Sequence, residues 1–112
     1  MHNYSAGLQY PKGEDELTPE GKVKKAVKEW LDEIGAYHFW PVQTGYGART
    51  LDCLVCYKGY FFAVETKAKG KKPTKFQQIT INEMEAAKAM VFTISDEATL
   101  NYAKSIVATY YP

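Results

Sequence analysis

The stretch from Thr50 to Lys67 (TLDCLVCYKGYFFAVETK) constrains the fold more than any other part of the chain. Two runs of strand-forming residues, 51–57 and 60–67, flank the pair Lys58-Gly59. Runs of this kind separated by two residues predict a β-hairpin with a two-residue turn, although Lys is a weaker first turn residue than Asn or Asp. The turn also determines the register, because the residue numbers of every directly opposed pair then sum to 117.

This register places two carboxylates, Asp52 and Glu65, opposite each other. Opposed residues have Cβ atoms roughly 4.5–5.5 Å apart, so like charges repel there. A divalent cation such as Mg²⁺ or Mn²⁺ removes the repulsion, since both prefer oxygen ligands. Lys67 follows on the same face of the strand. The pattern Asp-x12-Glu-x-Lys therefore indicates metal-assisted phosphodiester chemistry. The alternative is a solvated face on which Lys67 pairs with one of the acids.

The chemistry assigns roles to these groups. A cation bound by Asp52 and Glu65 polarises a phosphate, lowers the pKa of a bound water and stabilises developing negative charge. Lys67 can orient or deprotonate the attacking water or stabilise the transition state, and the sequence leaves these roles open. The backbone carbonyl of Thr66 points sideways from the strand, which makes it a further candidate metal ligand.

A first helix precedes the hairpin. Thr18 is typical of an N-cap and Pro19 of the first helical position. Glu20 falls on the face that we expect to be buried, although an acid in the first turn is also a common partner of the helix dipole. Gly35 ends the helix, and its apolar residues recur at helical spacing: Val23, Val27, Trp30, Leu31 and Ile34.

The remaining elements surround the hairpin. Residues 36–43 predict a first strand, which Pro41 assigns to an edge or a bulge, and residues 44–48 a Gly-rich loop in which Tyr46 can stack on a base. Thr74-x-x-Gln77 has the form of a capping box and begins a second helix. The expected apolar face of this helix comprises Phe76, Ile79, Ala86, Ala87 and Met90.

A last strand over residues 89–95 and a closing helix over residues 96–110 complete the order αβββαβα. This order predicts an α/β fold with a mixed central sheet flanked by helices. At 112 residues, the chain is expected to form one domain over residues 18–112, preceded by a flexible arm over residues 1–17.

The net charge is only +1, yet basic residues are concentrated in one segment. Residues 67–75 hold five lysines and no acid, so the other 103 residues carry a net charge of −4. This favours a polyanionic partner whose phosphates the lysines contact without reading sequence. Arg49 is a further candidate phosphate contact. The alternative is that the lysines only keep a loop soluble; they are Lys67, Lys69, Lys71, Lys72 and Lys75.

Composition also bears on location. No apolar run approaches the ~20 residues of a membrane-spanning helix, and residues 1–17 lack the apolar core of a signal peptide. We expect an intracellular, cytoplasmic protein without membrane partners, in which Cys53 and Cys56 are reduced thiols. Three residues apart on a strand, the two thiols point to opposite faces, which favours core packing over a zinc or redox site.

The motif Asp52-x12-Glu65-x-Lys67 resembles that of the PD-(D/E)XK nuclease superfamily. The similarity extends over residues 18–95, because an acidic helix precedes the motif and a Gln-bearing helix follows it. Within the superfamily the chain resembles the VRR-NUC branch, whose small stand-alone members resemble phage and archaeal junction-resolving nucleases. Leu51 stands where the family usually has proline, which lowers the specificity of the motif.

The resemblance implies a restriction-endonuclease-like αβββαβ core and a Mg²⁺- or Mn²⁺-dependent endodeoxyribonuclease that leaves 5′-phosphates. By position, Asp52 and Glu65 resemble its metal-binding acids, and Lys67 resembles its catalytic lysine. Glu20 resembles an additional acid that binds the metal directly or through water. Gln77 resembles the helix glutamine that supports the site, with Gln78 as the adjacent alternative.

The resemblance also implies a substrate and an assembly. The expected substrate is branched or structured DNA, such as a Holliday junction, and a phage-encoded protein would act in the host cytoplasm. A homodimer is expected because cutting two strands of a junction requires two sites. Two alternatives remain open: a nucleic-acid-binding module of the same fold without turnover, and an assembly or regulatory protein with a structural ion. Aromatic residues for a dimer interface are Tyr37, Phe39, Trp40, Tyr60, Phe61 and Phe62.

Overall fold

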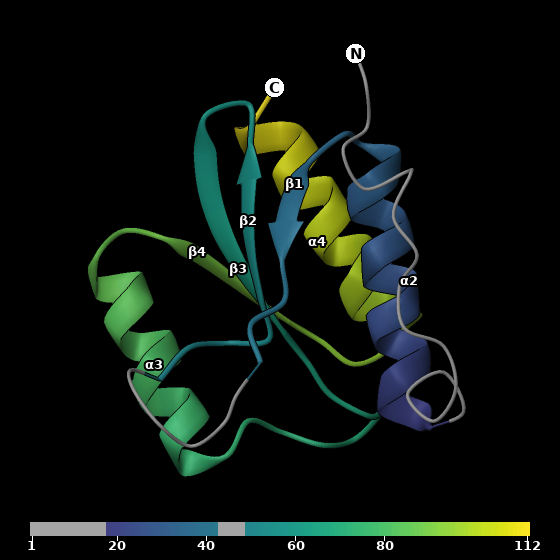
Figure 1. The fold of residues 1–112 in the computed structure, drawn as a ribbon, viewed down its shortest axis with the longest axis vertical. Coiled ribbons are helices and arrows are strands. Elements are labelled where there is room, and N and C mark those ends of the chain that lie inside the picture. The colour runs from purple at the N-terminus through teal and green to yellow at the C-terminus, as the bar shows by residue number, and fades with distance from the viewer. Residues whose placement is uncertain (1–17, 43–48) are drawn as a thin grey trace.

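The structure is a computed structural model that describes residues 18–42 and 49–112. The expected N-terminal arm and the Gly-rich loop with Tyr46 lie outside this part of the chain. The described residues form an α/β fold in which helices pack on a four-stranded mixed sheet (Figure 1). The elements follow the predicted order: α2 (Pro19–Glu33), β1 (Tyr37–Phe39), β2 (Cys53–Tyr57), β3 (Tyr60–Thr66), α3 (Lys75–Ala86), β4 (Met90–Ile94) and α4 (Glu97–Tyr110).

The predicted hairpin is confirmed as β2 and β3. Lys58 and Gly59 form its turn, both with positive φ (52° and 85°), the backbone of the tight turns that match strand twist. The register is the predicted one, with Tyr57 opposite Tyr60 and Cys53 opposite Val64. Both strands are shorter than predicted: β2 begins at Cys53 rather than at residue 51, and β3 ends at Thr66 rather than at residue 67.

The sheet order is β1-β2-β3-β4, with β1 and β2 antiparallel to their neighbours and β4 parallel to β3. β1 is shorter than predicted and lies at an edge, as Pro41 indicated. A polar chain ties β1 to α2: Trp40 Nε1 donates to Nδ1 of His38 (2.8 Å), and His38 Nε2 lies 2.8 Å from Asp32 Oδ1. Since an indole N–H only donates, Nδ1 must be the acceptor and Nε2 carries the proton toward Asp32.

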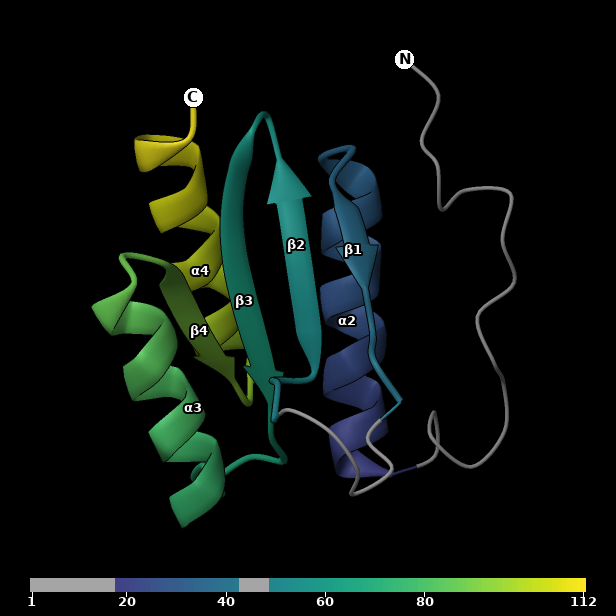
Figure 2. The same ribbon diagram turned by 60° about the vertical axis from the view of Figure 1, so that its left-hand side comes forward.

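Two apolar clusters lie on opposite faces of the sheet. The larger joins α2 and α4 to one face, with Leu31, Phe62 and Val107 nearly or fully buried. The smaller joins α3 to the other face through Leu51, Ala63 and Ile81. Figure 2 shows the same division, with α2 and α4 behind the sheet and α3 beside β4. Alternation along β3 therefore directs Phe62 and Val64 to one face and Ala63 and Glu65 to the other.

The expected apolar face of α3 was wrong. Phe76 is 65% exposed and Ile79 is 37% exposed, whereas Thr80 and Ile81 are buried. The helical spacing of Phe76 and Ile79 was real, but α3 turns a different stripe toward the sheet. The start of this helix was predicted correctly: Thr74 is its N-cap, and Thr74 and Gln77 form the reciprocal capping box.

Helices α2, α3 and α4 all begin at the same end of the sheet, where β3 and β4 end (Figures 1 and 2). Their N-caps are Thr18, Thr74 and Asp96. Helix N-termini carry partial positive charge, so this end of the molecule is electrostatically suited to anions. In the part of the chain that the structure covers, no helix is both long and apolar enough to cross a membrane.

Candidate active site

The acidic pair lies at the end of the sheet where the three helices begin. Asp52 occupies a bend directly before β2, between two buried residues. Leu51 packs with the α3 cluster, and Cys53 packs on the opposite face with the α2 and α4 cluster. Because both neighbours of Asp52 are fixed in different layers of the core, its backbone is held beside the end of β3.

The two acids are connected through hydrogen bonds rather than by facing side chains alone. Asp52 Oδ2 accepts from the N–H of Thr66 (3.0 Å) and from its hydroxyl (2.8 Å). The N–H of Asp52 donates to Glu65 Oε1 at 3.2 Å. The Asp52 carboxylate thus takes the place of a strand carbonyl at the end of the ladder. This explains why β2 starts one residue after Asp52 instead of one residue before it.

Glu65 is a buried acid, only 1% exposed. Its Oε2 has no hydrogen-bond partner among the described residues; the closest cation, Lys67 Nζ, lies at 3.5 Å, too far for a good hydrogen bond. Burial, and then the negative charge of Asp52, raises the pKa of Glu65 to about 7. The expected repulsion between the two acids therefore contributes, after burial, to the raised pKa of Glu65 and makes its carboxyl group harder to ionise.

The carbonyl of Thr66 points toward the same region. The N–H of Lys67 donates to Ile94 of β4 at 3.0 Å. In a trans peptide unit the C=O and N–H point in opposite directions, and the described chain has no cis peptide bond. The Thr66 carbonyl therefore points away from β4, toward the side of β3 on which Asp52 lies.

Among residues 18–42 and 49–112, Lys67 is the basic side chain paired with Glu65, and its side chain is only 12% exposed. The other lysines of the segment, Lys69, Lys71, Lys72 and Lys75, are exposed between β3 and the first turn of α3. Lys69 lies close enough to Asp96, at the start of α4, to contribute to the lowering of its pKa, after the hydrogen bonds from Thr99. The basic segment therefore borders the end of the sheet that carries the acids.

Glu20 and Gln77, which were also predicted to belong to the site, have partners other than the acidic pair. Glu20 is 41% exposed and pairs with Lys24 at 3.7 Å on α2. Gln77 Oε1 accepts from the N–H of Thr74, so the capping box occupies it. Across residues 18–42 and 49–112, no three His, Cys, Asp or Glu side chains gather as a metal-binding group. Glu20 consequently does not form a three-acid cluster with the pair.

Arg49 pairs with a residue of helix α3, and Gln78 lies on this helix and bonds within it. Arg49 Nη2 lies 3.7 Å from Glu83 Oε1, and both side chains are more than half exposed. Gln78 Nε2 donates to Asn82 Oδ1 on the outside of the same helix. Such exposed contacts are weak, so Arg49 can exchange its partner for a phosphate at little cost.

Both cysteines are free thiols, as expected. Cys53 is fully buried, and its burial raises the pKa of the thiol well above the usual range. Cys56 is exposed on the opposite face of the sheet. Their separation excludes a site that uses both sulfur atoms together.

The sequence did not reveal the role of the Thr66 side chain. The pattern identified its carbonyl but not its hydroxyl, which makes the shorter of its two hydrogen bonds to Asp52. The predicted register placed Asp52 one residue from the position opposite Thr66, but strand alternation assigned the two side chains to opposite faces, so the sequence held no direct signal for this bond. No protein-family model, curated protein or solved structure matches the chain.

The raised pKa of Glu65 predicts how stability depends on pH. An acid whose pKa is higher in the folded state keeps its proton while the unfolded chain releases it, so stability falls as pH rises from about 4.5 to about 7. Glu65→Gln removes this loss and keeps an acceptor for Asp52. In EDTA we expect the variant to match wild type near pH 4 and to exceed it by up to about 3 kcal/mol near pH 8.

Urea unfolding followed by tryptophan fluorescence across this pH range measures the difference. A constant offset between the two proteins at every pH would contradict the assignment of the titration to Glu65.

Proposed function

We propose that this protein is a Mg²⁺- or Mn²⁺-dependent DNA endonuclease that hydrolyses phosphodiester bonds, similar to the VRR-NUC branch of the PD-(D/E)XK nucleases. The observation that carries the proposal is the buried acid Glu65 next to the half-buried Asp52, with Lys67 beside them at the border of a basic segment. A buried carboxyl with an unsatisfied oxygen is costly for a fold that has no use for it. A divalent cation and a phosphodiester substrate together account for it.

The donor atoms of the site fit a hard divalent cation. Asp52 Oδ1 and Glu65 Oε2 have no hydrogen bonds in the described part of the chain, while their partner oxygens are fixed. The Thr66 carbonyl is directed to the same side of β3, and all three donors are oxygens, as Mg²⁺ and Mn²⁺ prefer. When bound, the cation would polarise the phosphate and acidify a water. Water, or Glu20 through water, would complete the coordination.

Lys67 would supply the positive charge beside the reacting phosphate. Its buried stem limits the positions of Nζ, which lies 3.5 Å from Glu65 Oε2. From there it can orient or deprotonate the attacking water or stabilise charge in the transition state. The exposed lysines before α3, with Arg49, would hold the flanking phosphates. Contacts of this kind position DNA without reading its sequence.

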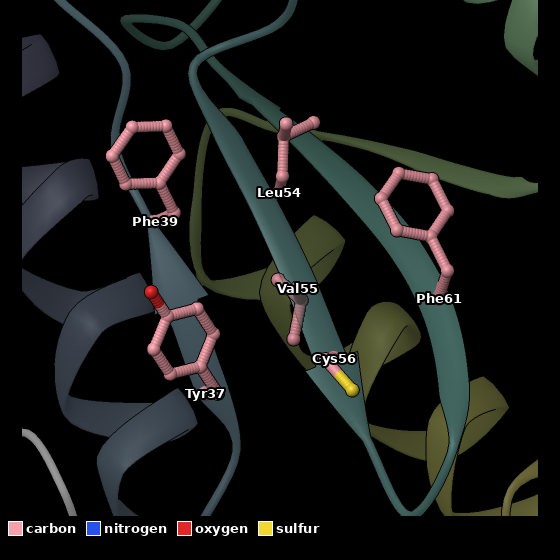
Figure 3. A pocket seen from close by; sticks show the side chains of 6 residues that line it. All are labelled: Tyr37, Phe39, Leu54, Val55, Cys56 and Phe61. Atoms are coloured by element: carbon pink, nitrogen blue, oxygen red, sulfur yellow. The ribbon is translucent and has the colours of Figure 1, made fainter.

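We further propose that the protein acts as a homodimer on branched DNA, since two strands of a junction require two sites. An open groove of about 360 Å³ on the sheet suits a second copy (Figure 3). Its lining is uncharged, which disfavours DNA and charged peptides but allows the surface to pair with itself about a two-fold axis. The lining residues are Tyr37, Phe39, Leu54, Val55, Cys56 and Phe61.

The exposed aromatic surface in this groove is large enough to form the centre of an interface. Tyr37, Phe39 and Phe61 are each about half exposed (52%, 52% and 45%). At roughly 150–250 Å² for a whole aromatic side chain, covering the exposed halves buries about 75–125 Å² each. The three rings then provide between about a quarter and a half of the ~800 Å² that a stable interface buries per partner.

Cleavage of plasmid and four-way-junction DNA tests the proposed activity. We expect cutting with Mg²⁺ or Mn²⁺ and none with EDTA, with the junction preferred. Lys67→Ala should lower the rate by at least about 100-fold, the usual contribution of one proton-transfer or charge-stabilising group, while gel-shift binding of the junction persists. Lys25→Ala, which removes an exposed lysine from the middle of α2, should cut normally.

Two results would oppose the activity. Binding of DNA without cutting under every metal would favour the alternative of a nucleic-acid-binding module. Cutting that survives both Lys67→Ala and Asp52→Asn would show that another site, or another protein, is responsible.

The oligomeric state tests the groove. Sedimentation equilibrium should give twice the 12.7 kDa chain mass for wild type. Phe39→Glu should give monomers with unchanged circular dichroism, because dimerisation would bury an unpaired charge. Tyr102→Glu, at a 63% exposed position on α4, should remain dimeric. A monomeric wild type would refute the dimer, and a dimeric Phe39→Glu variant would place the interface elsewhere.

A further inference from the structure

The hydroxyl of Thr66 is a polar group in the candidate site, and the proposed chemistry assigns no role to it. Thr66 is fully buried at the end of β3. Its N–H and its hydroxyl both donate to one oxygen, Asp52 Oδ2, at 3.0 and 2.8 Å. Any residue other than proline could make the first bond. The second needs a side-chain donor, which here is the threonine hydroxyl.

We propose that Thr66 is a positioning residue that fixes the orientation of the Asp52 carboxylate and keeps Oδ1 directed to a divalent cation. This inference rests on the proposed function. A carboxylate held at one oxygen by a single donor can pivot about that bond. Two donors from one rigid residue, both directed to Oδ2, leave the position of Oδ1 defined.

The properties of threonine suit this role. Hydrogen bonds to an ionised acceptor are stronger than neutral ones, so the hydroxyl adds substantially to the backbone bond. Branching at Cβ restricts χ1, which limits the directions in which the hydroxyl can point. Partners that orient a metal ligand without touching the metal typically change metal affinity by 10- to 100-fold. Because Thr66 contributes its carbonyl as well, one residue links the ligand to its support.

Mn²⁺ titration of the protein without DNA, by calorimetry, tests the proposal. Thr66→Val keeps the shape and the N–H but loses the hydroxyl, and we expect its Kd for Mn²⁺ to rise at least about ten-fold. Thr66→Ser restores the hydroxyl and should stay within about three-fold of wild type. Thr80→Val is the matched control: Thr80 is also buried, but its hydroxyl donates to the carbonyl of Phe76 (3.2 Å) on α3.

The outcomes separate this inference from the proposed function. If wild type binds Mn²⁺ and Thr66→Val binds it equally well, the positioning role is overturned and the metal site stands. If Thr66→Ser is as weak as Thr66→Val, the hydroxyl is not the cause and the inference fails. If wild type binds no Mn²⁺, the proposed function fails, and this inference with it.

A metal-free measurement tests the hydrogen bond itself. In EDTA, Thr66→Val should lower Tm by several degrees in the wild-type background, and by much less when Asp52→Ala is already present, because the hydroxyl has then lost its acceptor. Equal Tm shifts in both backgrounds would show that Thr66 and Asp52 are uncoupled and would overturn the inference.

Discussion

The position of the acidic pair depends on the hydrogen-bonded connection between the start of β2 and the end of β3. Three hydrogen bonds make it: two from Thr66 to Asp52, and one from the N–H of Asp52 to Glu65. They bring the half-buried Asp52 and the buried Glu65 together and at the same time satisfy one oxygen of each. The other two oxygens have no hydrogen bond within the described residues, and these are the atoms that we propose bind a cation.

The fold provides the setting for this connection. Apolar layers on both faces of the sheet fix Leu51 and Cys53, and with them the bend that carries Asp52. The parallel pairing of β3 with β4 engages the N–H of Lys67 and turns the Thr66 carbonyl to the acidic side. Burial raises the pKa of Glu65 to about 7, so near neutral pH the binding of a cation would be coupled to the release of a proton. Stability, charge and proposed chemistry thus depend on the same few groups.

Much of this arrangement could be predicted from the sequence, because it depends on local rules. Turn geometry set the hairpin register, and capping residues set the starts of α2 and α3. Predictions that depended on packing were less accurate: Phe76 and Ile79 repeat at helical spacing, yet α3 buries Thr80 and Ile81. Which stripe of a helix faces a sheet is decided by tertiary contacts. The partners of Glu20 and Gln77 are local ones, Lys24 and Thr74, and the roles predicted for these two residues in the site remain predictions.

The claim that the acids and the Thr66 carbonyl bind a divalent cation is the centre of this account. An anomalous difference map from a crystal soaked in Mn²⁺ tests it most directly, since Mn²⁺ scatters anomalously and coordinates oxygen. A cation bound by these donors should give a peak within coordination distance of Asp52 Oδ1, Glu65 Oε2 and the Thr66 carbonyl. A saturating soak with no peak there, or with its peak among other residues, would contradict it.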